Sequence, residues 1–323
     1  MGSSLTNYPN GVASFGAPVF PTPEGGYSKV IFVGSNYTTS PGGGTYENPA
    51  PTLLSVLKDG VVDTGDHRTL IFVRAGHTEN ISAADYFTLQ GARKRITIRG
   101  EGVGVERPTF TWTTATSSWL LDTDSIRIEN CVLNLDPGTG TTTVAAPITV
   151  SGAGCAIVGC QIRVGTDANS IVTIGITTTA GATDFTFAGN DVYGATAAEC
   201  TTAIQFVGAT RLKFIGNSVR CATSAVSVGV VRFLTTASTG IQMYDNVLEH
   251  RKAASETALT GMAGLTGQID YLHLNVLANA AAQLVIGGAN SAFLLPGNVQ
   301  CGANVFVTNQ LAETAAKMTP VSA

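Results

Sequence analysis

The chain has 323 residues and a net charge of −4, and 44% of its residues are hydrophobic while 12% are charged. This acidic balance gives no support for a nucleic-acid partner, which needs a basic footprint. The sequence has no apolar run of about 18 residues, and its start, MGSSLTNYPNG, lacks an apolar signal core. We therefore expect no membrane partner and synthesis in the cytoplasm. So few charges suit a surface that packs densely against neighbours.

Residues 1–27 are predicted to form an extended arm, because prolines and glycines recur too often for a helix or a strand core. The arm is nevertheless rich in apolar and aromatic residues, which disordered tails usually lack. We expect it to lie on a surface, either the chain's own rod or another subunit. The residues expected to make this contact are Tyr8, Pro9, Asn10, Phe15, Val19 and Phe20.

The segment after the arm predicts the start of a β-rich body. Residues 29–34 (KVIFVG) indicate a first strand, and the glycines at 42–44 indicate a turn. A phosphate-binding loop has Lys and then Ser or Thr after its glycines, at the start of a helix. Here Thr45, Tyr46 and Glu47 follow the glycines, so this segment is not such a loop. Residues 51–58 (PTLLSVLK) predict a short amphipathic helix near 51–59, with proline at its start. Such a helix would cover the open edge of a stack of strands.

A pattern that begins at residues 96–103 (ITIRGEGV) returns seven more times at near-constant spacing. A first apolar column contains Ile96, Ile126, Cys155, Phe185, Leu212, Ile241, Ile269 and Ala292. A second column, two residues on, contains Ile98, Ile128, Ile157, Phe187, Phe214, Met243, Tyr271 and Leu294. A third column contains Val103, Leu133, Ile162, Val192, Val219, Leu248, Val276 and Val299.

Each repeat is predicted to be one coil of a parallel β-helix. The apolar i, i+2 spacing is strand periodicity with one buried face. Between the second and third columns stand residues typical of sharp corners, Gly100, Asn130, Gly159, Gly189, Gly216, Asp245, His273 and Pro296. In the next position Asn190, Asn217 and Asn246 follow one another, which predicts a ladder of stacked amides. The fold class is therefore all-β, a single-stranded parallel β-helix over residues 28–307 with about 28 residues per coil. A β-sandwich with accidental spacing is the less favoured alternative.

The opening of this body resembles a known superfamily. The runs PTLLSVLKDG, TLIFVRAGHTENIS and RITIRGEG look like the start of pectin-lyase-like right-handed β-helices. Together with NYPNGVASFGAPVF, they resemble β-helical structural proteins of tailed bacteriophages, over residues 6–280. The resemblance implies a right-handed coil and a capsid decoration or cement protein on the outer surface of the virion, made in the host cytoplasm. It also implies the major capsid protein as partner and a homotrimer. The enzyme branches of the superfamily are not matched by any motif in the chain.

One place in the sequence offers a candidate glycan contact. Asp122 and Asp124 lie close to Trp112 and Trp119, and acids beside aromatic platforms can bind a sugar. A turn entering the strand at Ile126 explains the two acids equally well. A tailspike or tail fibre that binds or depolymerises host glycan is therefore the alternative function. A depolymerase requires carboxylates that converge, and the test is whether Asp122, Asp124 and Glu129 meet the tryptophans in one groove.

The remaining residues that can carry chemistry are scattered. We expect no catalytic residues, no cofactor and no metal, because His67, His77, His250 and His273 are dispersed. The chain is therefore predicted not to be an enzyme.

A cluster of cations, Arg93, Lys94, Arg95 and Arg99, is either a dock for an acidic partner surface or a solvated strand edge. Arg220 and Glu249 are expected to form a surface ion pair.

The six cysteines have no metal-binding spacing and are expected to be buried free thiols. Cys131 and Cys160 stack in adjacent coils, and the sequence leaves their linkage open. Residues 308–323 are predicted to form a C-terminal helix and tail.

Overall fold

The computed structural model describes the body of the chain with gaps between its turns. The described residues are 27, 29–35, 44–58, 68–84, 95–135, 143–165, 171–194, 200–222, 229–234, 236–250, 258–261, 264–276, 284–286, 292–294 and 299–301. The predicted arm, apart from Tyr27, and the predicted C-terminal helix at 308–323 lie outside these residues.

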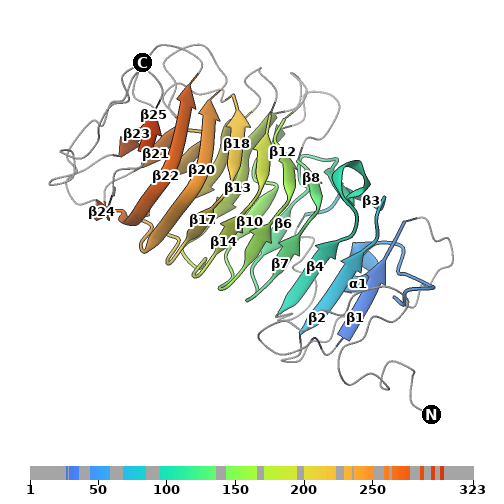
Figure 1. The fold of residues 1–323 in the computed structure, drawn as a ribbon. Coiled ribbons are helices and arrows are strands. Elements are labelled where there is room, and N and C mark those ends of the chain that lie inside the picture. Colours follow the sequence, from blue (N-terminus) through green and yellow to red (C-terminus); the bar gives the residue numbers. More distant parts are fainter. Residues whose placement is uncertain are drawn as a thin grey trace.

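The chain is a parallel β-solenoid with turns of about 29 residues, and 4% of it is helical. The strands follow one another along one axis, from β1 to β22 (Figure 1). This confirms the predicted all-β parallel coil, with a repeat one residue longer than expected.

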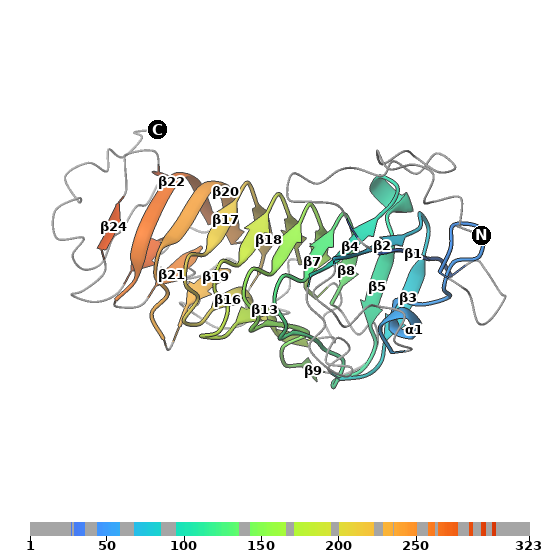
Figure 2. The same ribbon diagram turned by 90° about the horizontal axis from the view of Figure 1, so that it is seen from below.

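Two parallel sheets form the walls of the solenoid. The larger sheet comprises β1 (Lys29–Val33), β2 (Thr69–Val73), β3 (Thr78–Ile81), β4 (Ile96–Gly100), β5 (Thr109–Trp112), β7 (Arg127–Glu129), β8 (Val132–Asn134), β11 (Ala156–Val158), β12 (Gln161–Arg163), β14 (Thr186–Ala188), β15 (Asp191–Tyr193), β17 (Lys213–Ile215), β18 (Ser218–Cys221), β20 (Ile241–His250), β22 (Thr266–Val276), β24 (Ala292–Leu294) and β25 (Val299–Cys301). The smaller sheet comprises β6 (Trp119–Leu121), β9 (Thr143–Val144), β10 (Ile148–Val150), β13 (Ile171–Thr178), β16 (Cys200–Phe206), β19 (Val231–Phe233), β21 (Leu259–Gly261) and β23 (Leu284–Ile286). Figure 2 shows β13, β16, β19 and β21 following the same axis as the larger sheet.

The second apolar column of the sequence is a continuous stack inside the solenoid. Its members pair in register from turn to turn and are fully buried, in the order Ile98, Ile128, Ile157, Phe187, Phe214 and Met243. The stack begins earlier than the sequence pattern did, because Ile31 pairs with Ile71 and Ile71 with Ile98. Phe187 and Phe214 stack face to face, with ring centroids 5.5 Å apart and planes 5° apart. Each such burial contributes about 1.5–3 kcal/mol.

The predicted start of the third column was wrong. Val103 is 79% exposed, and Phe110 takes its place above Leu133. The reason is an insertion between β4 and β5, where a 3-10 helix, η2 (Gly104–Glu106), carries the chain outward before it returns. The inserted residues lengthen this one corner, so counting five residues on from Ile98 lands on the surface.

The predicted alignment of the seventh coil was also wrong, by two residues. Met243 pairs with Ile269, and Ile241 pairs with Gly267. His273 therefore lies within β22 opposite Val247 and is not a corner residue. A shift of two keeps every side chain on its own face of a strand, so alternation alone does not reveal it. In the third column Leu248 pairs with Leu274, two residues from the predicted Val276. In the eighth coil Val299 pairs with Leu272, four residues from Val276.

Five of the eight predicted corners have the left-handed backbone that their residue types allow, whereas Gly100 ends β4 without a positive φ. The φ angles at the successive corners are 55° at Asn130, 62° at Gly159, 63° at Gly189, 64° at Gly216 and 53° at Asp245. Each angle lies where L side chains are strained and where Gly, Asn and Asp are tolerated. These corners set the sharp bend between the two strands of each turn.

The predicted amide ladder is present and buried. The Oδ1 of Asn190 accepts from the amide of Cys160 (2.9 Å), that of Asn217 from Asn190 (3.0 Å), and that of Asn246 from Asn217 (3.0 Å). The Nδ2 groups of Asn190 and Asn217 each donate to the next amide oxygen along the ladder. All three side chains are at most 2% exposed. The ladder satisfies backbone groups at a corner that the strand hydrogen bonds do not reach.

A short helix lies at the N-terminal end of the solenoid. Helix α1 (Leu53–Lys58) falls within the predicted range and packs Leu53, Val56 and Leu57 into the core. Its first amides, those of Leu53 and Leu54, donate to the carboxylate of Glu79 at 2.7 and 3.1 Å. The buried ring of His77 contacts the same carboxylate at 3.1 Å. A charged cap of this kind satisfies helix amides that have no partner within the helix.

Candidate functional site

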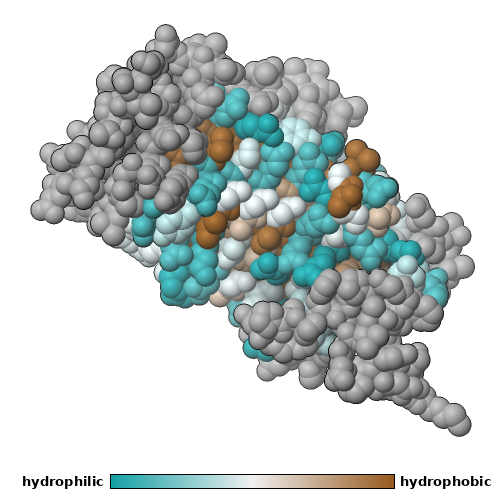
Figure 3. Space-filling view, in the orientation of Figure 1, coloured by the Kyte–Doolittle hydropathy of each residue, from teal (hydrophilic) through white to brown (hydrophobic). Residues whose placement is uncertain are grey.

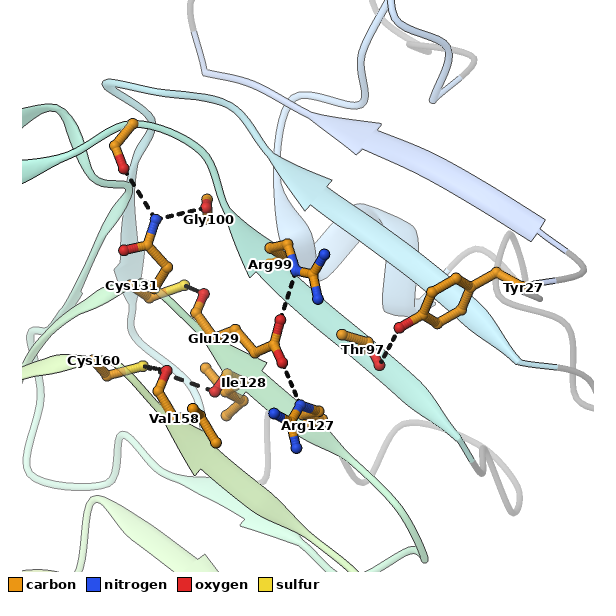
Figure 4. A network of polar contacts seen from close by, with 12 residues as sticks. Tyr27, Thr97, Arg99, Gly100, Arg127, Ile128, Glu129, Cys131, Val158 and Cys160 are labelled. Atoms are coloured by element: carbon orange, nitrogen blue, oxygen red, sulfur yellow. Dashed lines mark hydrogen bonds and ion pairs between the residues drawn. The ribbon is translucent and has the colours of Figure 1, made fainter. Parts of the chain in front are cut away.

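A hollow of about 480 Å³ lies on the outer face of the larger sheet, near its N-terminal end. We call it the arginine hollow. Four guanidinium groups and one carboxylate line it. Its lining residues are Tyr27, Arg68, Arg95, Thr97, Arg99, Ser125, Arg127, Glu129, Gly154 and Ala156. Figure 4 shows the centre of this group.

The register of the sheet brings these residues together from four consecutive turns. On β4 the side chains of Ile96 and Ile98 point inward, so those of Thr97 and Arg99 alternate to the outside. Arg127 stands beside Thr97, and Glu129 stands beside Arg99. The next turn offers only small groups at this point, Gly154 and Ala156. The hollow lies where the long side chains of Arg99 and Arg127 are followed, in the next turn, by the short residues Gly154 and Ala156.

Glu129 is held between two arginines from adjacent turns. Its carboxylate accepts from Nε of Arg99 at 2.5 Å and from Nε of Arg127 (Figure 4). Burial raises the pKa of Glu129, but the hydrogen bonds and charges of Arg127 and Arg99 outweigh it, and the net pKa lies below its usual value. Glu129 is therefore ionised at neutral pH. Because Glu129 pairs with both Arg99 and Arg127, this three-residue group carries one net positive charge.

Arg99 and Arg127 each donate only one of their N–H groups, that of Nε, to Glu129. A guanidinium has five N–H groups in a planar fork. Within the described chain, Arg99 and Arg127 each bond through Nε alone. Their side chains are 28% and 42% exposed, against 13% for Glu129. The terminal nitrogens are thus accessible to an anionic group from outside.

Tyr27, the last residue of the predicted arm, lies at the rim of the hollow. Its hydroxyl donates to Oγ1 of Thr97 at 3.3 Å (Figure 4). This contact fixes where the arm joins the body. The arm residues expected to bind a partner, from Tyr8 to Phe20, lie outside the described residues.

The predicted glycan contact is not assembled. Trp112 and Trp119 are fully buried, 4.8 Å apart between ring centroids, and Nε1 of Trp112 donates to the carbonyl of Pro147. They are core residues, because Trp112 shares the inward face of β5 with Phe110. Asp122 is exposed, while Oδ1 of Asp124 accepts from the amide of Ala153 at 3.2 Å, which is a turn contact. These acids do not meet Glu129, which lies in the arginine hollow.

The histidines and other metal-binding side chains remain separate in the described part of the chain. There, no three His, Cys, Asp or Glu side chains come together as a metal-ion site requires. His77 and His250 are buried in different turns, and His67 lies outside the described residues. None of the described helices is long and apolar enough to cross a bilayer.

Cys131 and Cys160 are free, buried thiols in adjacent turns. Sγ of Cys131 donates to the carbonyl of Glu129 at 3.3 Å, and Sγ of Cys160 to that of Val158 at 3.5 Å (Figure 4). The interaction with the neighbouring Cys160 thiol, followed by burial, raises the pKa of Cys131. Burial raises the pKa of Cys155 to about 11. These thiols are core groups rather than nucleophiles.

The predicted basic cluster is part of the hollow, and the sequence missed its other half. Arg95 and Arg99 line it, while Arg93 and Lys94 lie outside the described residues. Arg68 and Arg127 come from neighbouring turns. The sequence repeat aligns Arg127 with Thr97 and Glu129 with Arg99, and this alignment could have predicted that Arg127 and Glu129 join the cluster.

The expected ion pair of Arg220 differs from the observed one. Arg220 stands beside Glu249 as expected, but its Nη2 donates to Asp191 at 2.7 Å. Glu249 contributes a longer-range charge that helps to raise the pKa of Arg220. Register alone therefore predicted the neighbour but not the hydrogen-bond partner.

The fold and this site define a parallel β-solenoid protein with a positively charged hollow on one outer wall. No protein-family model matches the chain, and no curated protein sequence matches it.

Proposed function

We propose that the chain is a non-enzymatic structural protein of a tailed-bacteriophage virion. In this proposal it is a capsid decoration or cement protein on the outer capsid surface, with the major capsid protein as partner and a homotrimer as its assembled form. The observation that supports it most is the solenoid itself, whose stacked core and buried amide ladder make a stiff rod.

The outer wall of the rod also supports a packing role. Beyond the arginine hollow one outward column of the larger sheet holds small or apolar side chains over three turns. Glu129 is followed in its column by Val158, Ala188 and Ile215, all half-buried. Figure 3 shows this face, with pale and brown residues gathered between teal ones. A wall of this kind suits contact with neighbouring subunits.

The arm supplies the second part of the proposal. Its apolar residues join the body at Tyr27, beside the arginine hollow. A segment that is rich in apolar residues, and that the sequence predicts to be extended, is suited to lie on the shell or on a sister subunit.

The experiment compares shell binding by the full chain and by residues 28–323. Both are mixed with purified capsids of the phage that encodes the chain, sedimented, and quantified, and cryo-electron microscopy locates the bound protein. Removal of the arm is expected to abolish co-sedimentation without lowering the melting temperature of the rod. A full-length control with Ser3, Ser4 and Thr6 replaced by alanine should bind as the parent does. Unchanged binding without the arm contradicts the proposal. If the chain does not bind capsids but binds or cleaves host glycan, the result supports the tail-fibre or tailspike alternative.

A further inference from the structure

We propose that the arginine hollow and the apolar column beside it form a docking surface for an acidic segment of a partner protein. Carboxylates of that segment would enter the hollow, and its apolar side chains would lie along Val158, Ala188 and Ile215. We take the capsid shell as the source of this segment, and that choice rests on the proposed function. The docking surface itself does not rest on it.

The charge of the hollow selects an anionic partner. The whole chain has a net charge of −4, yet four of its 18 lysines and arginines line this one hollow, where Glu129 is the single acidic lining residue. Charge so concentrated against the sign of the whole protein steers acidic groups to one place on the surface. Arginine is also the side chain best suited to hold a carboxylate at an interface, because its fork makes two parallel hydrogen bonds.

Glu129 shows how a carboxylate is held at this site. It sits between Arg99 and Arg127, which lie on adjacent strands about 4.8 Å apart. Each arginine uses its Nε for Glu129, and its terminal nitrogens make no hydrogen bond to another described residue. A second carboxylate, brought by the partner, can bind to those nitrogens from the solvent side. Arg95 and Arg68 also line the hollow.

The apolar column favours a protein segment over a sugar. Val158 stands directly beside Glu129, and Ala188 and Ile215 continue the same line. Arginine next to small apolar groups is the composition of protein interfaces. Trp112 and Trp119, the aromatic rings best suited to stack on a sugar, are inside the core.

The test uses a fluorescein-labelled oligoglutamate peptide and the full chain, with binding followed by fluorescence anisotropy. The double variant Arg99→Gln, Arg127→Gln is expected to weaken binding at least about tenfold, as close charge pairs at interfaces do. Glu129→Gln is expected to strengthen binding, because it removes the competing carboxylate. Arg211→Gln is the matched control, since Arg211 is 61% exposed on the same sheet wall and pairs with Asp184. It should leave the affinity unchanged.

Four outcomes would overturn the inference. One is an affinity unchanged in the double variant, and another is a Glu129→Gln variant that does not gain affinity while its melting temperature shows it to be folded. A heparin-derived oligosaccharide of equal charge that binds the hollow more tightly than the peptide would make the ligand a glycan. Self-association of the parent that is lost in the double variant would make the occupant a second copy.

The inference and the proposed function fail separately. Capsid binding that persists in the double variant leaves the decoration role standing and removes the hollow from it. If the chain binds the peptide through the hollow but does not bind capsids, the docking surface is supported and the decoration role is contradicted.

Discussion

Replacing the central rung of the amide ladder, Asn217→Ala, tests whether the ladder holds the turns together. The side chain of Asn217 makes four hydrogen bonds. Its Nδ2 donates to the carbonyl of Phe187 and to Asn246, and its Oδ1 accepts from the backbone and side-chain amides of Asn190. At about 1 kcal/mol net for each bond, the substitution should lower the free energy of unfolding by about 4 kcal/mol. The buried amide of Asn190 is left without its acceptor, which is why the loss is not recovered from water.

The assay is equilibrium unfolding in urea, followed by tryptophan fluorescence, because Trp112 and Trp119 are both in the core. Asn80→Ala is the matched control, since Asn80 is exposed on β3 and the substitution removes the same atoms. The control should change the free energy of unfolding by less than about 0.5 kcal/mol. If Asn217→Ala costs no more than Asn80→Ala, the ladder is not a stabilising element and the reasoning is refuted.

Three further predictions concern the core, the hollow and the thiols. Phe187→Ala removes one ring of the stack with Phe214 and should cost about 3–5 kcal/mol in urea unfolding, whereas Val105→Ala, at a residue that is 99% exposed, should cost almost nothing. The pKa of Glu129 is lowered by folding, so its carboxylate stabilises the fold above the ordinary value of 4.5 and this stability is lost as pH falls through the folded pKa. The difference in free energy of unfolding between the parent and Glu129→Gln should therefore shrink in acid, and a difference that does not change with pH would show that the carboxylate is not held by its arginines. Cys131, Cys155, Cys160, Cys200 and Cys221 are buried, and the pKa of Cys155 is about 11, so an aromatic disulfide reagent should modify at most one of the six thiols per native chain; rapid modification of two or more would contradict the buried core.

The sequence predicted the interior well because the interior obeys simple rules. Alternation placed Ile98, Ile157 and Phe214 in one stack, and the corner types Asn130 and Gly159 indicated left-handed backbone. Stacked turns with identical register make these local signals reinforce one another. The fold class therefore followed from the repeat without any family match.

The errors arose where a local rule has more than one solution. Val103 was assigned to the core because nothing in ITIRGEGV shows that the corner is extended by η2. The shift at Ile269 was invisible because strand periodicity is unchanged by two residues. Trp112 and Trp119 were considered as a possible glycan contact, although the alternation in TFTW already put Trp112 on the same face as Phe110.

The arginine hollow is formed by the register between turns, which cannot be recognised from any single strand of the sequence. In a solenoid the inward column must stay apolar at every turn, while the outward column is free to change. Here the outward positions change abruptly, from Arg99 and Arg127 to Val158 and Ala156 within a turn or two. Neither feature marks a site when a single strand is considered, because an outward arginine or alanine is ordinary. It is the fixed register between turns that places the long charged side chains beside the short apolar ones, and so makes one wall of a uniform rod suited to bind an acidic partner.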